Sequence, residues 1–329
     1  MNKKMIILAL CSLLLAPCSA VNAQQPGKIF RIGFLDNSTA SGIAVLSEAF
    51  RQDLRKLGWI EGKNLTIENR FSGQKRERLA ELAADLVRLN VDLIVTTGDP
   101  PALAAKGATS TIPIVMANTA DPVGSGLVAN LARPGGNVTG LSSLGTELNT
   151  KRLEVLKDAI PKLARVGLLR GTGGGIASPA QLKDLRSAAL ALKLKLEEIE
   201  TQLGAKGLEQ AFQTAKQKQV GAIMTISSRA LFGERMRIVE LANKHRLPAI
   251  YFSKEFVDEG GLMSYGADYD DLFRRAAVYV DKILKGAKPA DLPVQQATKF
   301  EFVINLRAAK QIGLQLSPEF LSRANKVIK

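Results

Sequence analysis

Side chains that could carry out covalent chemistry are scarce in this sequence. The single histidine, His245, stands at the end of a helical pattern, where capping or solvation is its ordinary role. The sequence has no Gly-x-Ser-x-Gly elbow and no histidine pair that could bind zinc. Two carboxylate pairs, Glu197 with Glu198 and Asp270 with Asp271, fall on a strand surface and at a helix start, where solvation and N-capping explain them. We therefore expect no enzyme activity, no metal site and no cofactor.

A glycine-rich stretch, RVGLLRGTGGG at residues 165–175, raises the question of phosphate binding, because glycine lets backbone N–H groups approach a ligand closely. A dinucleotide fingerprint requires a third glycine where Ile176 stands, and the Gly-Lys-Ser/Thr of a Walker loop is absent from the sequence. The glycines from Gly171 to Gly175 are better explained as an exposed turn at the mouth of a cleft.

Polar loops follow the short apolar runs of the sequence. In open α/β sheets, ligands bind beyond the carboxyl ends of parallel strands, so these loops are the natural place for a binding site. The loops are DNSTASG (36–42), TTGDPPA (96–102) and ANTADPVG (117–124) in the first half, and RGTGGGIASP (170–179), ISSRALFG (226–233) and YFSKEF (251–256) in the second.

The elements that must position these loops alternate between strand and helix patterns. Short β-branched runs alternate with amphipathic stretches such as residues 47–59, where Phe50, Leu54 and Leu57 share one face. Strand, helix and strand in this order build a parallel sheet with right-handed crossovers. The strand runs are residues 28–36, 64–71, 91–99 and 112–121 in the first half, and residues 164–171, 194–200, 220–228 and 247–255 in the second.

The second set of runs repeats the first at a nearly constant separation, as the pairs Ile32 with Val166 and Pro113 with Pro248 illustrate. We therefore predict an α/β protein with two similar Rossmann-like lobes, whose parallel sheets are joined by hinge crossings. The first crossing is expected near residues 140–147. The predicted N-terminal lobe comprises residues 24–142 plus roughly 266–290, and the C-terminal lobe residues 143–265 plus roughly 291–329.

The first 23 residues have the layout of a secretory signal peptide. Lys3 and Lys4 precede an apolar run that is too short to span a membrane, and the small residues that follow end at Ala23. Both cysteines, Cys11 and Cys18, lie in this segment, so the mature chain would have no disulfide or thiolate site. Lipidation of Cys18 is the alternative to cleavage after Ala23. We predict a soluble protein exported to the periplasm.

The formal net charge of +14 makes nucleic acid a candidate partner. However, the basic residues are spread along amphipathic helices and interleaved with Glu and Asp, as in LRKLGWIEGK at residues 54–63. No basic strip studded with aromatic residues occurs in the sequence. A solvated basic surface is the better interpretation, and no nucleic-acid partner is expected.

The mature chain resembles a known family over nearly its whole length, most specifically in two long segments, residues 117–143 (ANTADPVGSGLVANLARPGGNVTGLSS) and residues 260–321. The family it resembles is that of the substrate-binding proteins of ABC transporters with the type I periplasmic-binding-protein fold, in a branch whose characterised members bind aromatic amino acids. The resemblance implies a monomer that captures a small-molecule solute, an amino acid or related compound, and delivers it to an ABC permease in the inner membrane. One departure is RGTGGG at residues 170–175, where relatives commonly have an Asn-Pro-type turn; the ligand can therefore differ from theirs.

Candidate ligand-binding residues are taken from the loops at the strand ends. Hydroxyls and backbone amides would hold a carboxylate, Asp99 or Asp121 an ammonium group, and Tyr251 an apolar part of the ligand. Each has a structural alternative: Asp121 can cap a helix, Ser142 can satisfy a hinge backbone and Tyr251 can belong to the core. The candidates are Asn37, Ser38, Asp99, Asn118, Asp121, Ser142, Thr172, Ser228 and Tyr251.

Two other functions fit the same sequence features. A sensory ligand-binding protein of the periplasm would share the fold, and an enzyme would need a cleft carboxylate with a strongly displaced pKa.

Overall fold

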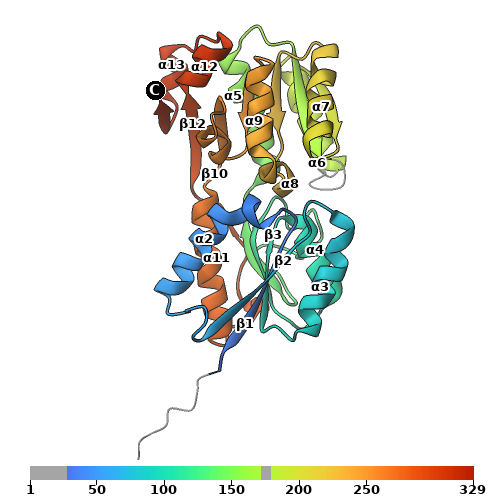
Figure 1. Cartoon of the computed structure of the whole chain (residues 1–329), viewed down its shortest axis with the longest axis vertical. Helices are drawn as coiled ribbons and strands as arrows, with labels where there is room; N and C mark the ends of the chain where they lie inside the picture. Colours follow the sequence, from blue (N-terminus) through green and yellow to red (C-terminus); the bar gives the residue numbers. More distant parts are fainter. Residues whose placement is uncertain (1–27, 172–178) are drawn as a thin grey trace, which may run out of the picture.

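The computed structural model describes residues 28–171 and 179–329. The predicted signal peptide, both cysteines and the candidate Thr172 with the glycines that follow it lie outside the described residues. The chain forms two stacked α/β lobes, each built on its own sheet (Figure 1). The predicted fold class is confirmed.

The lower lobe in Figure 1 contains a six-stranded sheet in the order β11-β5-β4-β3-β1-β2, in which all of the described pairings are parallel. Its strands are β1 (Phe30–Asp36), β2 (Leu65–Phe71), β3 (Leu93–Thr97), β4 (Ile114–Thr119), β5 (Val138–Ser142) and β11 (Gln295–Gln296). Its helices are α2 (Ala40–Lys56), η1 (Arg76–Arg78), α3 (Leu79–Arg88), α4 (Asp99–Ala108), α11 (Tyr269–Leu284) and η2 (Pro289–Asp291).

The upper lobe contains a seven-stranded sheet in the order β13-β12-β10-β9-β8-β6-β7, in which β10 and β12 are antiparallel and the other described pairs are parallel. Its strands are β6 (Arg165–Gly171), β7 (Lys195–Thr201), β8 (Ala222–Thr225), β9 (Ala249–Tyr251), β10 (Met263–Ala267), β12 (Phe300–Asn305) and β13 (Lys326–Ile328). Its helices are α5 (Gly145–Ala159), α6 (Pro179–Ala191), α7 (Ala205–Gln217), α8 (Arg229–Gly233), α9 (Arg235–Lys244), α10 (Glu255–Asp258), α12 (Leu306–Ile312) and α13 (Pro318–Ser322).

The chain passes between the two sheets three times. The first passage joins β5 to α5 at residues 143–144, the second joins β10 to α11 at Asp268, and the third joins β11 to β12 at residues 297–299. Strand β11 pairs with β5, so the first sheet reaches beyond residue 290, where the sequence placed the change of lobe. The limits of the two lobes stay a prediction.

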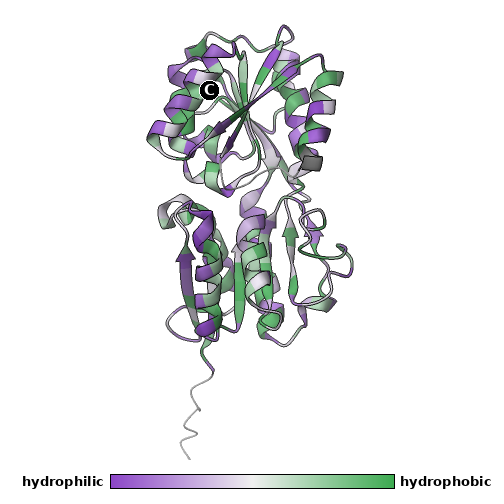
Figure 2. Ribbon diagram, turned by 90° about the vertical axis from the view of Figure 1, so that its right-hand side faces the viewer, coloured by the Kyte–Doolittle hydropathy of each residue, from purple (hydrophilic) through white to green (hydrophobic). Residues whose placement is uncertain are grey.

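Alternating strand residues fill both faces of the first sheet, as a period of two requires. In β1, Ile32 and Phe34 are buried in the same core cluster as Phe50 of α2, whereas Leu35 belongs to a second cluster that contains Leu86 of α3. Figure 2 shows the corresponding pattern in the helices, which carry hydrophilic and hydrophobic residues on different sides. Both faces of the sheet are therefore covered, and its strand ends are held rigidly.

Helix α11 belongs by packing to the lower lobe, although it follows a strand of the upper one. It lies beside α2 and packs against β4 and β5 (Figure 1). Its apolar face buries Leu272, Phe273, Ala276, Ala277 and Val280. The helix starts at the second crossing, with Asp268 as its N-cap, because the Asp268 side chain accepts a hydrogen bond from the Asp271 backbone N–H. Among the described helices, none is long and apolar enough to cross a membrane.

Candidate ligand-binding site

A cavity of about 150 Å³ lies where the two lobes meet. The lower lobe contributes residues that follow β1, β3 and β4, and the upper lobe contributes the segment from Ile226 to Ala230 and Phe252. The crossings contribute Ser143, Gly145 and Tyr269. Its volume matches that of a cavity that accepts a benzene ring. The cavity can therefore hold a small molecule that both lobes contact.

Four of the candidate residues from the sequence line this cavity: Asn37, Asp99, Asn118 and Ser228. They come together because the strands that precede them are parallel and end at the same edge of their sheets. That these side chains bind a ligand stays a prediction.

The other described candidates are not among the cavity-lining residues. Ser38 is buried and donates a hydrogen bond to Asp36, and Asp121 accepts one from the Gly124 backbone N–H at 2.7 Å. Ser142 accepts a long hydrogen bond from the Leu144 backbone N–H, at 3.4 Å. Tyr251 is fully buried in the core. These contacts are the structural alternatives to ligand binding.

Several cavity residues were not among the sequence candidates. Four of them are adjacent in sequence to a candidate: Ser143 follows Ser142, Phe252 follows Tyr251, and Ser227 and Arg229 flank Ser228. Tyr269 and Asn149 are farther away, on helices that begin at the second and first crossings. The polar and aromatic residues missed include Ser143, Asn149, Ser227, Arg229, Phe252 and Tyr269.

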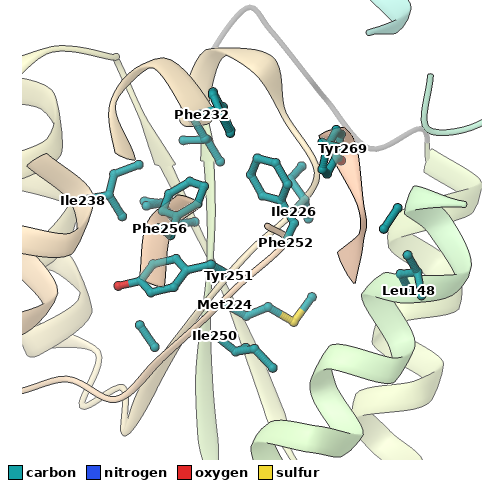
Figure 3. Close-up of a cluster of buried hydrophobic side chains, with 14 of the residues drawn as sticks. Leu148, Met224, Ile226, Phe232, Ile238, Ile250, Tyr251, Phe252, Phe256 and Tyr269 are labelled. Carbon is teal, nitrogen blue, oxygen red and sulfur yellow. The ribbon is translucent and has the colours of Figure 1, made fainter. Parts of the chain in front are cut away.

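Apolar side chains form one wall of the cavity. Phe252 and Tyr269 meet edge to face, with ring centroids 6.0 Å apart, and Ile226 lies beside them (Figure 3). Phe252 in turn contacts the ring of Phe256, which stacks on Tyr251 with ring centroids 4.7 Å apart. The wall is therefore fixed from behind by the core of the upper lobe, and it can contact an apolar part of a ligand.

Asp99 is the carboxylate that lines the cavity. It stands at the start of α4, and its Oδ1 accepts a hydrogen bond from the Ala120 backbone N–H at 2.9 Å. Burial raises the pKa of Asp99 to about 6. The hydrogen bond from the Ala120 backbone N–H lowers the pKa in part, and the negative charge of the nearby Asp121 raises it further. At neutral pH most of the population is ionised, and a cationic group of a ligand would stabilise this form.

A buried guanidinium lies behind the cavity. Arg152 of α5 is fully buried; it donates to the Tyr265 carbonyl at 2.9 Å, to Ser227 Oγ at 3.4 Å and to the Asn149 side chain. Burial lowers the pKa of Arg152 to about 10, so the group is still a cation at neutral pH. Within residues 28–171 and 179–329 it forms no ion pair with a carboxylate. Its positive charge is therefore felt at Asn149 and Ser227, which line the cavity.

Tyr269 follows the second crossing and lies near Ser143 of the first crossing, at the cavity. Burial raises the pKa of the Tyr269 hydroxyl. Four weaker effects lower it: hydrogen bonding by Ser227, the charge of Arg152, hydrogen bonding by Ser143 and the charge of Arg229. The hydroxyl thus stays neutral at physiological pH and lies near Ser143 of the first crossing and Ser227, which follows β8 in the upper lobe. Tyr269 can act as a polar as well as an apolar contact for a ligand.

The two lobes contact each other around the cavity. Gln74 Nε2 of the lower lobe donates to Glu234 Oε1 of the upper lobe at 2.9 Å, and Arg235 Nη1 donates to the Gly42 carbonyl at 3.4 Å. Gly42 also lies directly against Gly233, because a Cβ atom added to Gly42 would be 3.2 Å from the Gly233 Cα. These contacts describe a closed arrangement of the lobes. Among the described residues, no group of three or more His, Cys, Asp or Glu side chains is placed to hold a metal ion.

Comparison with known proteins identifies the family. The chain is similar to a tyrosine-binding protein of Clostridioides difficile, with 30% identity over 82% of this chain and 76% of that protein. A solved structure of a conserved domain protein from Vibrio cholerae is 28% identical, covers 91% of this chain and 100% of its own, and superposes with a TM-score of 0.82. An ABC domain from Streptococcus pneumoniae in complex with L-Trp is 26% identical, covers 90% of this chain and 100% of its own, and has a TM-score of 0.79. The model of the ABC transporter substrate-binding protein family matches residues 41–328, and the chain belongs to this family.

Proposed function

We propose that this protein captures an amino acid with an apolar or aromatic side chain between its lobes and delivers it to an ABC permease in the inner membrane. It does so in the periplasm, as a monomer, after removal of residues 1–23. The observation that carries the proposal is the interlobe cavity, which combines an acidic group, buried cationic groups and an aromatic wall. An amino acid has the matching ammonium, carboxylate and side chain.

The names of two similar proteins support the same ligand class, since one is called a tyrosine-binding protein and the other was solved with L-Trp.

A ligand panel tests the proposal. The mature chain is titrated with L-tyrosine, L-tryptophan, L-phenylalanine, L-leucine, organic acids and sugars, and thermal unfolding is recorded. A ligand that binds only the folded protein stabilises it by about 2.7 kcal/mol at a concentration of 100 Kd, which corresponds to a rise in Tm of several degrees. We expect at least one of the apolar amino acids to give this rise and the sugars to give none. A rise with sugars alone, or with no amino acid, contradicts the proposal.

The pKa of Asp99 predicts how binding depends on pH. Since an ammonium group binds the ionised carboxylate, affinity for an amino acid should be constant above about pH 7 and fall as the pH drops through about 6, where Asp99 takes up a proton. In Asp99→Asn, binding should be weaker and nearly independent of pH over this range. The unliganded variant should be more stable than the wild type at neutral pH, because an ionised carboxylate with a raised pKa destabilises the folded state. Calorimetric titration between about pH 5 and about pH 8 measures the affinities, and thermal unfolding without ligand at neutral pH measures the difference in stability.

A ligand without an ammonium group provides the control. 3-Phenylpropionate should not lose affinity as Asp99 takes up a proton. If L-phenylalanine binds equally well at both ends of the pH range, Asp99 does not bind the ammonium group.

Closure of the lobes can be blocked at Gly42. A leucine there would collide with Gly233 in the closed arrangement, because an added Cβ atom would be 3.2 Å from the Gly233 Cα. Within the lower lobe the same atom would also lie 3.2 Å from Thr39 Oγ1 and 3.4 Å from the Ser38 Cβ, and these contacts persist when the lobes separate. We expect Gly42→Leu to weaken ligand binding about tenfold or more, and thermal unfolding of the unliganded variant measures the separate cost of the contacts within the lobe. Gly107→Leu is the matched control, since Gly107 also lies in a helix but has open space around it. Equal affinities of the two variants would show that closure at this contact is not needed for binding.

A further inference from the structure

Arg229 is the first residue of α8, and it stands at the interface of the lobes. Its side chain is 5% exposed and lies against Gly98 of the lower lobe, where an added Cβ atom would be 3.0 Å from the Arg229 Cγ. The guanidinium stacks on Phe232, 4.3 Å from the ring centroid, and it lines the cavity. The charged group is thus held in place by packing on both sides and removed from bulk water.

The polar atoms of this guanidinium are not satisfied by the protein. Nε, Nη1 and Nη2 are buried, and in the described part of the chain none of them has a hydrogen-bond partner. A buried donor without a partner costs free energy, more so when it carries a charge, and arginine has five N–H donors in a planar fork. Such an arrangement is expected where a ligand supplies the missing acceptors.

Asp36 does not supply these acceptors. It is the closest carboxylate, but its Oδ2 is 3.5 Å from Arg229 Nε, which is an ion-pair distance without a hydrogen bond. Asp36 is already engaged at the end of β1: its Oδ1 accepts from the Ser38 backbone N–H and hydroxyl at 2.5 Å, and its Oδ2 accepts from the Thr97 hydroxyl. Asp36 therefore balances part of the charge of Arg229 and leaves the Nη1 and Nη2 donors available.

The charges around the cavity favour an anion near Arg229. Arg152 is a second buried cation, and its contacts with Asn149 and Ser227 place it next to the cavity wall. The other lobe contributes the acidic group of the lining, Asp99, and also the guanidinium of Arg76, which is exposed. A ligand with a negative group toward Arg229 and a positive group toward Asp99 would satisfy both lobes at once.

We propose that Arg229 binds the carboxylate of the ligand through its Nη1 and Nη2 donors, and that the protein therefore selects free amino acids against their amides, esters and decarboxylated amines. This inference rests on the proposed function and names the group that sets its substrate class. A paired guanidinium and carboxylate form charge-assisted hydrogen bonds with matched planar geometry, which neutral carbonyl groups do not reproduce. The hydroxyls and backbone amides expected from the sequence to hold the carboxylate then have a secondary role.

The test compares each acid with its carboxamide. L-phenylalanine, L-tyrosine and L-tryptophan, their carboxamides and the corresponding amines are titrated calorimetrically into the wild type and into Arg229→Gln. In the wild type we expect the best-binding acid to bind about 30-fold or more tightly than its carboxamide, as loss of hydrogen bonds to a charged group implies. In Arg229→Gln the affinities of acid and carboxamide should be about equal.

Two further variants keep this test decisive. Arg229→Lys retains the charge without the planar fork, and it should keep a reduced preference for the acid. Arg235→Gln is the matched control, because Arg235 also stacks on Phe232, at 5.0 Å, but pairs with Glu259 and does not line the cavity. Because Arg235 Nη1 also donates to the Gly42 carbonyl across the lobes, this variant is expected to bind both ligands more weakly, but its ratio of acid to carboxamide affinity should equal that of the wild type. Thermal unfolding of Arg229→Gln without ligand should show a lower Tm than that of the wild type, because Asp36 is left as a buried charge without its ion-pair partner. The affinities are therefore compared at a temperature at which both proteins are folded.

The outcomes separate the inference from the proposed function. If acid and carboxamide bind the wild type equally well, or if Arg229→Gln keeps the preference for the acid, the role of Arg229 is refuted while amino-acid binding stands. If neither acids nor carboxamides bind the wild type, the proposed function itself fails.

Discussion

We expect Gly140→Ala to destabilise the protein by at least about 3 kcal/mol. Gly140 lies in β5, the strand that leads into the first crossing, and has a φ of +134°, a conformation that L residues rarely adopt. An added Cβ atom would lie 2.2 Å from the Met116 carbonyl oxygen and 2.6 Å from the Met116 backbone nitrogen in β4. Because the backbone of a paired strand cannot move aside without breaking the sheet, the clash must be relieved by distortion of the lower lobe. Denaturant unfolding of the mature chain measures the loss.

A nearby glycine separates the steric clash from the backbone strain. Gly136 has a φ of +67°, and nothing lies within 4 Å of a Cβ atom added there. Gly136→Ala should therefore cost only the strain of the left-handed region, about 1–2 kcal/mol. If Gly140→Ala costs no more than Gly136→Ala, β4 and β5 do not approach each other as described.

The second large effect is expected for Phe273→Ala in α11. Phe273 is fully buried, and its removal leaves a cavity that typically costs about 3–5 kcal/mol. The helix follows the second crossing and carries Tyr269 at its start, so loosening it should also weaken ligand binding. Val278→Ala is the control on the same helix, since Val278 is 39% exposed and its truncation should change stability by less than about 0.5 kcal/mol. Thermal unfolding and ligand titration of both variants test whether α11 is packed as described; similar Tm values would contradict this packing.

The fold could be predicted from the sequence because its two halves repeat one pattern. Buried parallel strands such as VDLIV at residues 91–95 read as continuous apolar runs, and the helices between them have a clear apolar face. The pairing of β11 with β5 could not be predicted in this way. Gln295 and Gln296 are exposed polar residues with no alternation, and only the neighbouring strand shows where they belong.

At several strand ends the candidate taken from the sequence and the residue that lines the cavity differ by one position, and the difference has a physical cause. Successive residues at the end of a strand point to opposite faces, so a shift of one residue exchanges a cavity residue for a core residue. Tyr251 was chosen, but it stacks on Phe256 in the core, whereas Phe252 lines the cavity. Ser142 and Ser143 differ in the same way.

Arg229 and Arg152 could not be found from the sequence by the same reasoning. Arginine in a helical pattern ordinarily marks a solvated surface, and the sequence contains many such residues. Arg229 is buried because the second lobe closes against the first, and Arg152 because α5 packs at the crossings. Burial of this kind depends on how distant segments meet, which no local pattern encodes.

The central claim is that both lobes hold the charged ends of one amino acid in the cavity between them. A crystal structure of the mature chain with the tightest-binding amino acid tests it most directly. The account predicts the ligand carboxylate within hydrogen-bond distance of the Arg229 guanidinium, the ammonium group at Asp99, and the side chain against Phe252 and Tyr269. A ligand that contacts one lobe alone, or one bound outside this cavity, would contradict it.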